Sequence, residues 1–256
     1  MRIYFLVDNL AGRNCRAEWG FSLFIEGKKN ILFDFGASNL FLLNAQKLGI
    51  DLEKVDYLVL SHGHWDHGNG LEYIANKKLI CHPEAFIRRY RDNEYIGLPI
   101  NLAQAREKFD LILSSDPIKI DEEIVFLGQI PRRNDFEAKD TVFCKEDGSK
   151  DFVLDDTGLA FKTEKGLVII SGCAHAGICN TVDYAVKITG MNKVYAVLGG
   201  FHLKGKDQIT NKTITYLQKL RVEKVMPSHC TQFPALVEFN KAFGNPQLYC
   251  GQILEL

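Results

Sequence analysis

The stretch Val55–Asn69 reads VDYLVLSHGHWDHGN, and it carries three of the seven histidines of the chain. Its first part, Val55–Leu60, is mostly apolar and rich in strand-forming residues, which predicts a buried strand. Ser61 then opens a short polar turn that contains all three histidines and one aspartate. Glycines at 63, 68 and 70 permit the tight backbone that such a turn needs. The stretch therefore predicts a strand that delivers a cluster of polar side chains.

The polar turn has the composition of a metal site. In extended backbone, side chains two positions apart point the same way, so His62 and His64 are placed to bind one ion. Asp66 and His67 follow at a different angle and suit a second ion nearby. Three imidazoles and a carboxylate, without a thiolate, favour zinc, with iron or manganese as alternatives. A histidine-rich surface loop is the other interpretation, but a position directly after a buried strand argues against it.

The segment His62–His67, HGHWDH, resembles the H-x-H-x-D-H signature of the metallo-β-lactamase superfamily. The resemblance implies an α/β fold, the four-layer αββα metallo-β-lactamase sandwich. It also implies one or two divalent metal ions, which in this superfamily activate a bridging hydroxide.

Composition describes an ordinary globular chain of 256 residues with 46% hydrophobic and 25% charged residues. The net charge of −1 gives no field that would attract nucleic acid or an anionic membrane. The apolar run Ile3–Val7 is too short for a signal peptide or a membrane span. Seven cysteines without a C-x-x-C pair favour reduced thiols. We therefore expect a cytoplasmic protein with a small-molecule substrate, and the oligomeric state stays open.

Asp34 ends a predicted strand and begins the sequence Asp34-Phe35-Gly36. A strand that ends D-x-G at this distance before the histidine motif is usual in the superfamily. Its aspartate commonly braces the metal loop by hydrogen bonds, and the resemblance implies this role for Asp34. A simple turn or capping residue is the alternative.

The chain is predicted to be a single domain over residues 1–256, with an insertion or cap at about 83–150. The sequence pattern changes after Pro83, where predicted helices alternate with short predicted strands. The predicted helices are Glu84–Arg91 and Leu102–Phe109. Short strands are predicted at Leu111–Leu113 and Ile124–Leu127. An ordinary continuation of the sandwich is the alternative.

Three later strands each stop at a glycine or proline and are followed by a histidine. These histidines are His175, His202 and His229. Ligands gather at strand ends in α/β sheets, so the repetition indicates that the three side chains converge.

The resemblance implies a division of the ligands between two ions. The first ion takes His62, His64 and His175, and the second takes Asp66, His67 and His229. His202 is a ligand, a catalytic acid facing the substrate, or a neighbour that shields the site. His82, before Pro83, is interpreted as structural.

The bridging aspartate that is usual in the superfamily has no counterpart here. In the superfamily this aspartate follows a glycine at the end of a strand. The dipeptides at such positions here are Gly172-Cys173 and Gly200-Phe201, and neither contains a carboxylate. We therefore expect one tight ion and a second, weaker one. Cys173 is interpreted as a buried small hydrophobe, with ligation as thiolate as the alternative.

Four further segments depart from the usual superfamily pattern, namely Gly128–Arg132, Gly172–His175, Gly199–Leu203 and Pro227–Thr231. Together they resemble one branch of the superfamily, the dihydropteroate-synthase-like or 4-(β-D-ribofuranosyl)aminobenzene 5′-phosphate synthase-like metal-dependent hydrolases.

The leading hypothesis for function is a hydrolase that uses a metal-bound hydroxide on a phosphate-bearing ester, with Asp66 as orienter or proton acceptor and His202 as a further catalytic residue. Arg132 and Arg133 are predicted to clamp the phosphate, and Asn9 to contact the substrate. Two arginines on a solvated face are the alternative. A transferase that joins 4-hydroxybenzoate or 4-aminobenzoate to a phosphoribosyl donor is the second hypothesis. A metal-binding protein without turnover is the third.

Overall fold

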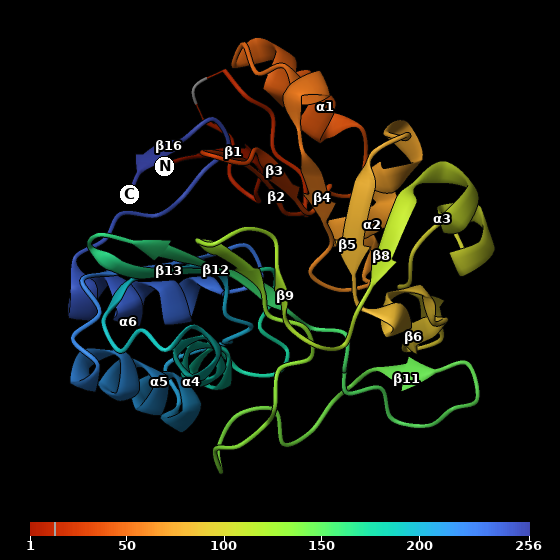
Figure 1. Cartoon of the computed structure of the whole chain (residues 1–256). Coiled ribbons are helices and arrows are strands. Elements are labelled where there is room, and N and C mark those ends of the chain that lie inside the picture. The colour runs from red at the N-terminus through yellow and green to blue at the C-terminus, as the bar shows by residue number, and fades with distance from the viewer. Residues whose placement is uncertain (13) are drawn as a thin grey trace. The chain divides into compact units, whose positions relative to one another are not determined.

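The computed structural model describes residues 1–12 and 14–256 (Figure 1). The chain divides into two compact units. Unit 1 comprises Met1–Ser114, Val142–Asp151 and Leu248–Leu256, and unit 2 comprises Ser115–Thr141 and Phe152–Gln247.

Within the described residues of unit 1, seven strands form one sheet in the order β16-β1-β2-β3-β4-β5-β8. The strands are β1 (Arg2–Val7), β2 (Ser22–Glu26), β3 (Ile31–Phe33), β4 (Tyr57–Val59), β5 (Lys78–Cys81), β8 (Asp110–Leu113) and β16 (Ile253–Glu255). Neighbours from β16 to β3 pair antiparallel, whereas β3, β4, β5 and β8 run parallel. Parallel strands end at a common edge, and this property positions the histidine motif.

The helices of unit 1 pack apolar side chains against this sheet. Helix α1 (Leu40–Lys47) contributes Leu40, Phe41 and Ala45 to a core shared with Leu32 and Leu58 of the sheet. The remaining helical elements are α2 (Trp65–Gly68), α3 (Leu102–Lys108) and the 3₁₀ turns η1 (Leu52–Lys54), η2 (Asn69–Tyr73) and η3 (Pro83–Phe86). A small sheet pairs β6 (Arg89–Arg91) with β7 (Glu94–Tyr95) and β11 (Cys144–Lys145).

Unit 2, as far as the described residues show, has one six-stranded sheet in the order β15-β14-β13-β12-β10-β9. The strands are β9 (Ile118–Lys119), β10 (Ile124–Phe126), β12 (Gly158–Thr163), β13 (Gly166–Ser171), β14 (Val194–Gly200) and β15 (Lys224–Ser228). Strands β13, β14 and β15 run parallel. The helices α4 (Ile178–Thr189), α5 (Gln208–Lys219) and α6 (Phe233–Phe243) lie together on one side of β12 and β13 (Figure 1).

One of the predicted helices differs from the structure. The predicted helix Glu84–Arg91 is instead the turn η3 followed by strand β6. Arg89 explains the difference, because its fully buried side chain pairs with Asp151 at 3.3 Å and donates to the carbonyl of Glu84. A buried ion pair with a distant residue thus overrides the local helical pattern.

Part of the predicted insertion belongs to the two main sheets. Strand β8 extends the sheet of unit 1, and β9 and β10 extend the sheet of unit 2. A role of the rest of residues 83–150 as a cap stays a prediction. Among the described residues, no helix combines the length and apolar character needed to cross a membrane.

Candidate metal centre

The histidine motif follows β4 at the edge where the parallel strands of unit 1 end. Phe33 of β3 lies opposite Val59 of β4, so the residues after each strand are neighbours. The backbone N–H of Asp34 donates to the carbonyl of Val59 at 2.9 Å. Asp34 then adopts a left-handed backbone with φ of 58°. The register of two short strands therefore brings Asp34 to the start of the histidine loop.

The carboxylate of Asp34 is the centre of a buried hydrogen-bond chain. Its Oδ1 accepts from the backbone N–H of Ser61 at 2.7 Å, and its Oδ2 accepts from the Ser61 hydroxyl at 2.7 Å. The Nδ1 atom of His67 lies 2.7 Å from the same Oδ2. Because the Ser61 hydroxyl donates its proton to Asp34, the hydroxyl oxygen accepts a hydrogen bond from Nδ1 of His62 at 2.9 Å.

This chain of hydrogen bonds determines the tautomers of the His62 and His67 rings. With Nδ1–H of His62 and His67 donating to Ser61 and Asp34, the acceptor lone pair of each ring is on Nε2. Neutral imidazoles oriented in this way are the usual form of histidine metal ligands.

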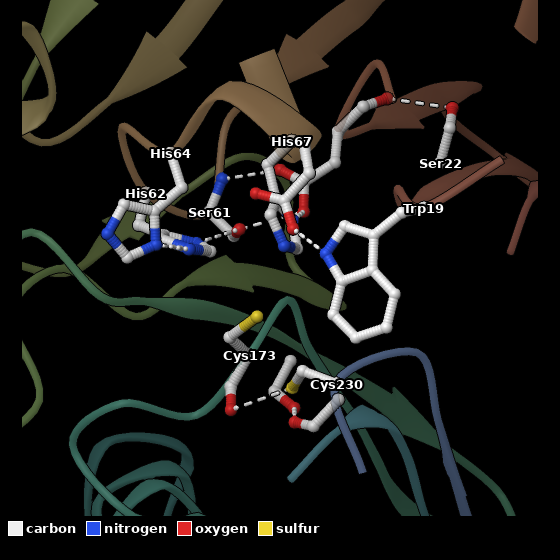
Figure 2. Close-up of polar contacts among 12 residues, drawn as sticks. Trp19, Ser22, Ser61, His62, His64, His67, Cys173 and Cys230 are labelled. Carbon is white, nitrogen blue, oxygen red and sulfur yellow. Dashed lines mark hydrogen bonds and ion pairs between the residues drawn. The ribbon is translucent and has the colours of Figure 1, made fainter. Parts of the chain in front are cut away.

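A pair of buried nitrogens lies close to the spacing that a metal ion requires. The Nε2 atom of His62 lies 2.9 Å from Nδ1 of His64 (Figure 2). Two nitrogens at about 2.0–2.1 Å from a tetrahedral zinc ion are roughly 3.3 Å apart, so a small rotation suffices. The side chains of His62 and His64 are 0% and 6% exposed. The residues present therefore fit a divalent ion.

Close backbone packing explains two glycines of the motif. A Cβ atom at Gly63 would lie 1.9 Å from the carbonyl oxygen of Ala85, and one at Gly70 would lie 2.0 Å from that of Phe35. No side chain fits at either position without moving the backbone.

Asp66 is anchored by a tryptophan that the sequence analysis did not single out. The indole N–H of Trp19 donates to Oδ2 of Asp66 at 2.9 Å (Figure 2). The backbone N–H of Phe21 donates to the carbonyl of Asp66 at 3.1 Å, which fixes the two segments together. Asp66 is 8% exposed, whereas Trp19 is 52% exposed. An open aromatic face therefore adjoins the predicted metal ligand.

In unit 2, the register of the parallel strands brings the later motifs together. Ser171 lies opposite Gly199, and Gly200 lies opposite Ser228, so the three strands end at one level. The ring centroids of His175 and His202 are 4.4 Å apart. His202 and His229 both have left-handed backbone, with φ of 50° and 49°. The prediction that these strand ends converge is confirmed within unit 2.

Two cysteines lie in the same cluster. The Sγ atom of Cys230 accepts from the backbone N–H of His202 at 3.3 Å and lies 3.6 Å from the carbonyl oxygen of Cys173 (Figure 2). Burial opposes ionisation of the Cys230 thiol. Hydrogen bonds with Cys173 and His202, together with the charges of His202 and His229, nevertheless hold its pKa well below the ordinary value.

Asp156 braces the turn that carries His175. Its Oδ2 accepts from the backbone N–H of Ala176 at 2.9 Å. Burial raises the pKa of Asp156 to about 7, although hydrogen bonds from the turn and the charge of Arg132 oppose the rise.

The predicted substrate residues have different surroundings. The Nη2 atom of Arg132 donates to the carbonyl oxygens of Phe152 and Val153. Arg133 has an exposed side chain, and its backbone N–H donates to Oδ1 of Asn180 at 2.8 Å. Asn9, in unit 1, donates its backbone N–H to Asp8. Substrate binding by these residues stays a prediction.

The predicted ligands divide between the units. His62, His64, Asp66 and His67 belong to unit 1, and His175 and His229 belong to unit 2. Their assignment to two ions, with one ion held tightly, stays a prediction. His82 caps η3 through Nδ1, which accepts from the backbone N–H of Glu84 at 3.1 Å.

Comparison with known proteins identifies the family of the fold. Residues 20–127 match the model of the metallo-β-lactamase superfamily. The solved structure of Tm1679, a metal-dependent hydrolase of the β-lactamase superfamily, has a TM-score of 0.90 and 32% identity, with coverage of 100% of this chain and 99% of that one.

Two proteins of Methanocaldococcus jannaschii are similar over nearly the whole length. The uncharacterized protein MJ0448 is 39% identical over 93% of this chain and 94% of its own. A 7,8-dihydropterin-6-methyl-4-(β-D-ribofuranosyl)-aminobenzene-5′-phosphate synthase is 38% identical over 100% of this chain and 96% of its own. The chain therefore belongs to the metallo-β-lactamase superfamily, has its fold, and is homologous to these two proteins.

Proposed function

We propose that the chain is a metal-dependent hydrolase that acts on a phosphate-bearing small-molecule ester. The observation that carries the proposal is a buried series of hydrogen bonds from Asp34 through Ser61 to His62. His67 is hydrogen-bonded to the same Asp34 carboxylate. A carboxylate that sets the tautomers of two neighbouring imidazoles prepares them as ligands. The name of Tm1679, a metal-dependent hydrolase, supports the same reaction class.

In this proposal, His62, His64 and His175 hold the first ion, and Asp66, His67 and His229 hold the second. A divalent ion supplies Lewis acidity, which lowers the pKa of a water molecule and polarises the bond to be broken. Zinc is favoured by the imidazole-rich ligands, with iron or manganese as alternatives.

Asp66 is proposed to orient the attacking water and to accept its proton. The Trp19 indole holds Oδ2 of Asp66 at 2.9 Å, which limits rotation of the carboxylate. His202 is proposed as a ligand, as a proton donor to the leaving group, or as a neighbour that shields the site. The separation of 4.4 Å between its ring centroid and that of His175 supports a role next to this proposed ligand.

The phosphate specificity rests on Arg132, Arg133 and the similarity to the synthase. A guanidinium recognises phosphate through paired hydrogen bonds. The product named for the synthase carries a 5′-phosphate, so a homologue with a phosphorylated substrate is consistent with that relationship.

The synthase also supports a second candidate function, a transferase. Its name describes a pterin joined to an aminobenzene ribose phosphate. Trp19 favours such a flat substrate in this chain, because its ring is 52% exposed beside Asp66. Aromatic faces offer flat rings a stacking surface.

The test is turnover by the protein loaded with zinc, iron(II) or manganese(II), assayed separately. Phosphomonoesters, phosphodiesters, carboxylic esters and lactones test hydrolysis, and a pterin alcohol derivative with an aminobenzene ribose phosphate tests transfer. The hydrolase proposal expects metal-dependent cleavage of a phosphate-bearing ester, abolished by chelator and restored by metal.

Transfer without cleavage of any ester would replace the hydrolase proposal with the transferase. Stoichiometric metal binding without turnover on either panel would instead identify a metal-binding protein without catalysis.

A further inference from the structure

We propose that Cys173, His202 and Cys230 are a sulfur-containing ligand set for a soft divalent ion of the zinc(II) or iron(II) class. The inference deepens the metal-dependent function proposed above and rests on it. It assigns a ligand role to sulfur, which the histidine and aspartate motif does not include.

The three side chains share one small volume within unit 2. The two Sγ atoms and a ring nitrogen of His202 lie within 4.8 Å of one another. Two thiolates at about 2.3 Å from a tetrahedral zinc ion have their sulfurs roughly 3.8 Å apart. The three atoms therefore lie near enough for side-chain rotations to bring all of them onto one ion.

The backbone around the sulfurs is shaped for close approach. A Cβ atom at Gly200 would lie 2.6 Å from Sγ of Cys230 and 3.1 Å from Cα of Cys173. Only glycine at this position lets the end of β14 approach the two cysteines this closely. The hydrogen bond from Gly200 N–H to the carbonyl of Gly172, at 3.0 Å, holds β14 and the Cys173 segment at this separation.

His202 contributes through both its ring and its backbone. Its left-handed conformation, with φ of 50°, is unfavourable for a residue with a side chain. The conformation directs its N–H to Sγ of Cys230 at 3.3 Å. Hydrogen bonds of this kind stabilise a charged sulfur and orient it toward a metal.

The surroundings distinguish these cysteines from inert core residues. Cys179 of α4, for comparison, is 1% exposed, and burial together with the nearby carboxylate of Glu137 raises the pKa of its thiol. Cys173 is 3% exposed, yet its neighbours include the polar atoms of Cys230 and His202. A thiolate ligand shifts the metal preference of a site from manganese toward zinc or iron(II).

The experiment replaces the metal with cobalt(II) under anaerobic conditions. Thiolate ligation to cobalt(II) produces an intense near-ultraviolet charge-transfer band, which nitrogen and oxygen ligands lack. We compare the wild type with Cys173→Ser, Cys230→Ser and the double variant. Cys144→Ser is the matched control, because this half-buried thiol lies in β11 of unit 1 and donates to the carbonyl of Tyr90.

The wild type and the control should show the band. Each single variant should lose part of it, and the double variant should lose all of it. Cobalt affinity should fall in the single variants by at least the roughly 10–100-fold that loss of an outer hydrogen-bond partner costs. Zinc X-ray absorption on the unmodified protein should show sulfur scattering at about 2.3 Å, which keeps the test valid if a variant does not fold.

Cobalt bound by the wild type without the band, together with zinc absorption free of sulfur scattering, would overturn the sulfur assignment and leave the metal-dependent function intact. A Cys173–Cys230 disulfide in the metal-loaded protein would overturn it as well. Failure of the wild type to bind cobalt or zinc would remove both this inference and the proposed function.

Discussion

The Nδ1 atom of His67 lies 2.7 Å from Oδ2 of Asp34, and both side chains are fully buried. Because the Ser61 hydroxyl donates to the same oxygen, the carboxylate also controls His62 through Ser61. One residue at the end of β3 thus orients two imidazoles of the loop after β4.

Asp34→Asn should weaken metal binding more than it weakens the fold. An amide cannot accept from both Ser61 and His67 at one oxygen as strongly as a carboxylate, so the rings lose their fixed tautomer. We expect metal affinity or turnover to fall on the order of 10–100-fold. Competition with a chromophoric chelator measures the affinity.

The matched control for this change is Asp110→Asn, since Asp110 is exposed on β8. Circular dichroism of both variants reports the fold. An Asp34→Asn protein that unfolds, with normal affinity in its folded fraction, would make Asp34 a purely structural residue.

His64→Ala and His67→Ala should each reduce metal content, because sites with three protein ligands rarely survive the loss of one. His64→Ala is expected to remove the first, tight ion, and His67→Ala the second, weaker one. Elemental analysis after dialysis counts the ions per chain, and activity should fall in parallel.

His82→Asn is the control for the histidine variants, because asparagine keeps an acceptor for the backbone N–H of Glu84 that His82 caps. Its metal content should match the wild type. Normal metal content and rate in either His64→Ala or His67→Ala would remove that residue from the ligand set.

Trp19→Phe should test the anchor on Asp66 without removing the aromatic surface. Phenylalanine has no N–H, so Oδ2 of Asp66 loses its donor at 2.9 Å. We expect turnover to fall by roughly 10-fold, as for other partners of metal ligands. Steady-state kinetics should show the loss in kcat more than in KM, because stacking is retained.

Tyr73→Phe is the comparison for Trp19→Phe, since Tyr73 is another aromatic residue that is 50% exposed. It should leave kcat unchanged. An unchanged kcat in Trp19→Phe would show that the indole N–H does not position Asp66.

The sequence was sufficient to predict the elements whose signals are local. The apolar run before Ser61 predicts β4, and the repeated strand ends before His175, His202 and His229 predict their convergence in unit 2. These predictions succeed because a parallel sheet gathers its carboxyl ends at one edge, whatever the details of packing.

The sequence was insufficient where distant segments meet. Trp19 reaches Asp66 because Phe21 N–H pairs with the carbonyl of Asp66, a contact that no local pattern encodes. Arg89 lies in strand β6, and not in the predicted helix, because its buried side chain forms an ion pair with Asp151. The nearness of Cys230 to His202 depends on Gly200 and the left-handed turn after β14, which the spacing of residues does not reveal.

Glu137→Ala should lower stability strongly, although Glu137 lies outside the proposed site. Its carboxylate accepts from the backbone N–H groups of Cys179 and Asn180, each at 3.0 Å, and from Nδ2 of Asn134 at 2.6 Å. A buried donor left without its acceptor costs about 1–3 kcal/mol. With three donors affected, we expect the free energy of unfolding to fall by at least about 3 kcal/mol.

Urea unfolding measures the effect of Glu137→Ala, and Glu122→Ala at an exposed position should stay within about 0.5 kcal/mol of the wild type. A small change in Glu137→Ala would mean that water replaces the carboxylate at the start of α4.

Arg133→Lys should separate phosphate recognition from structural support. Arg133 has an exposed side chain, whereas Nη2 of Arg132 donates to the carbonyl oxygens of Phe152 and Val153. Lysine keeps the charge but loses the planar fork that binds two phosphate oxygens. A charge-assisted pair contributes roughly 1.5–3 kcal/mol, so kcat/KM for a phosphate-bearing ester should fall by about 10- to 150-fold.

Arg132→Lys carries the same change at the neighbouring position. It should show the phosphate effect together with a loss of about 1–2 kcal/mol in unfolding free energy, because the carbonyls of Phe152 and Val153 lose a donor. Neither variant should alter metal content or the turnover of uncharged esters. Equal losses on charged and uncharged esters in both variants would mean that the arginine pair supports the fold around residues 152–153 and takes no part in phosphate recognition.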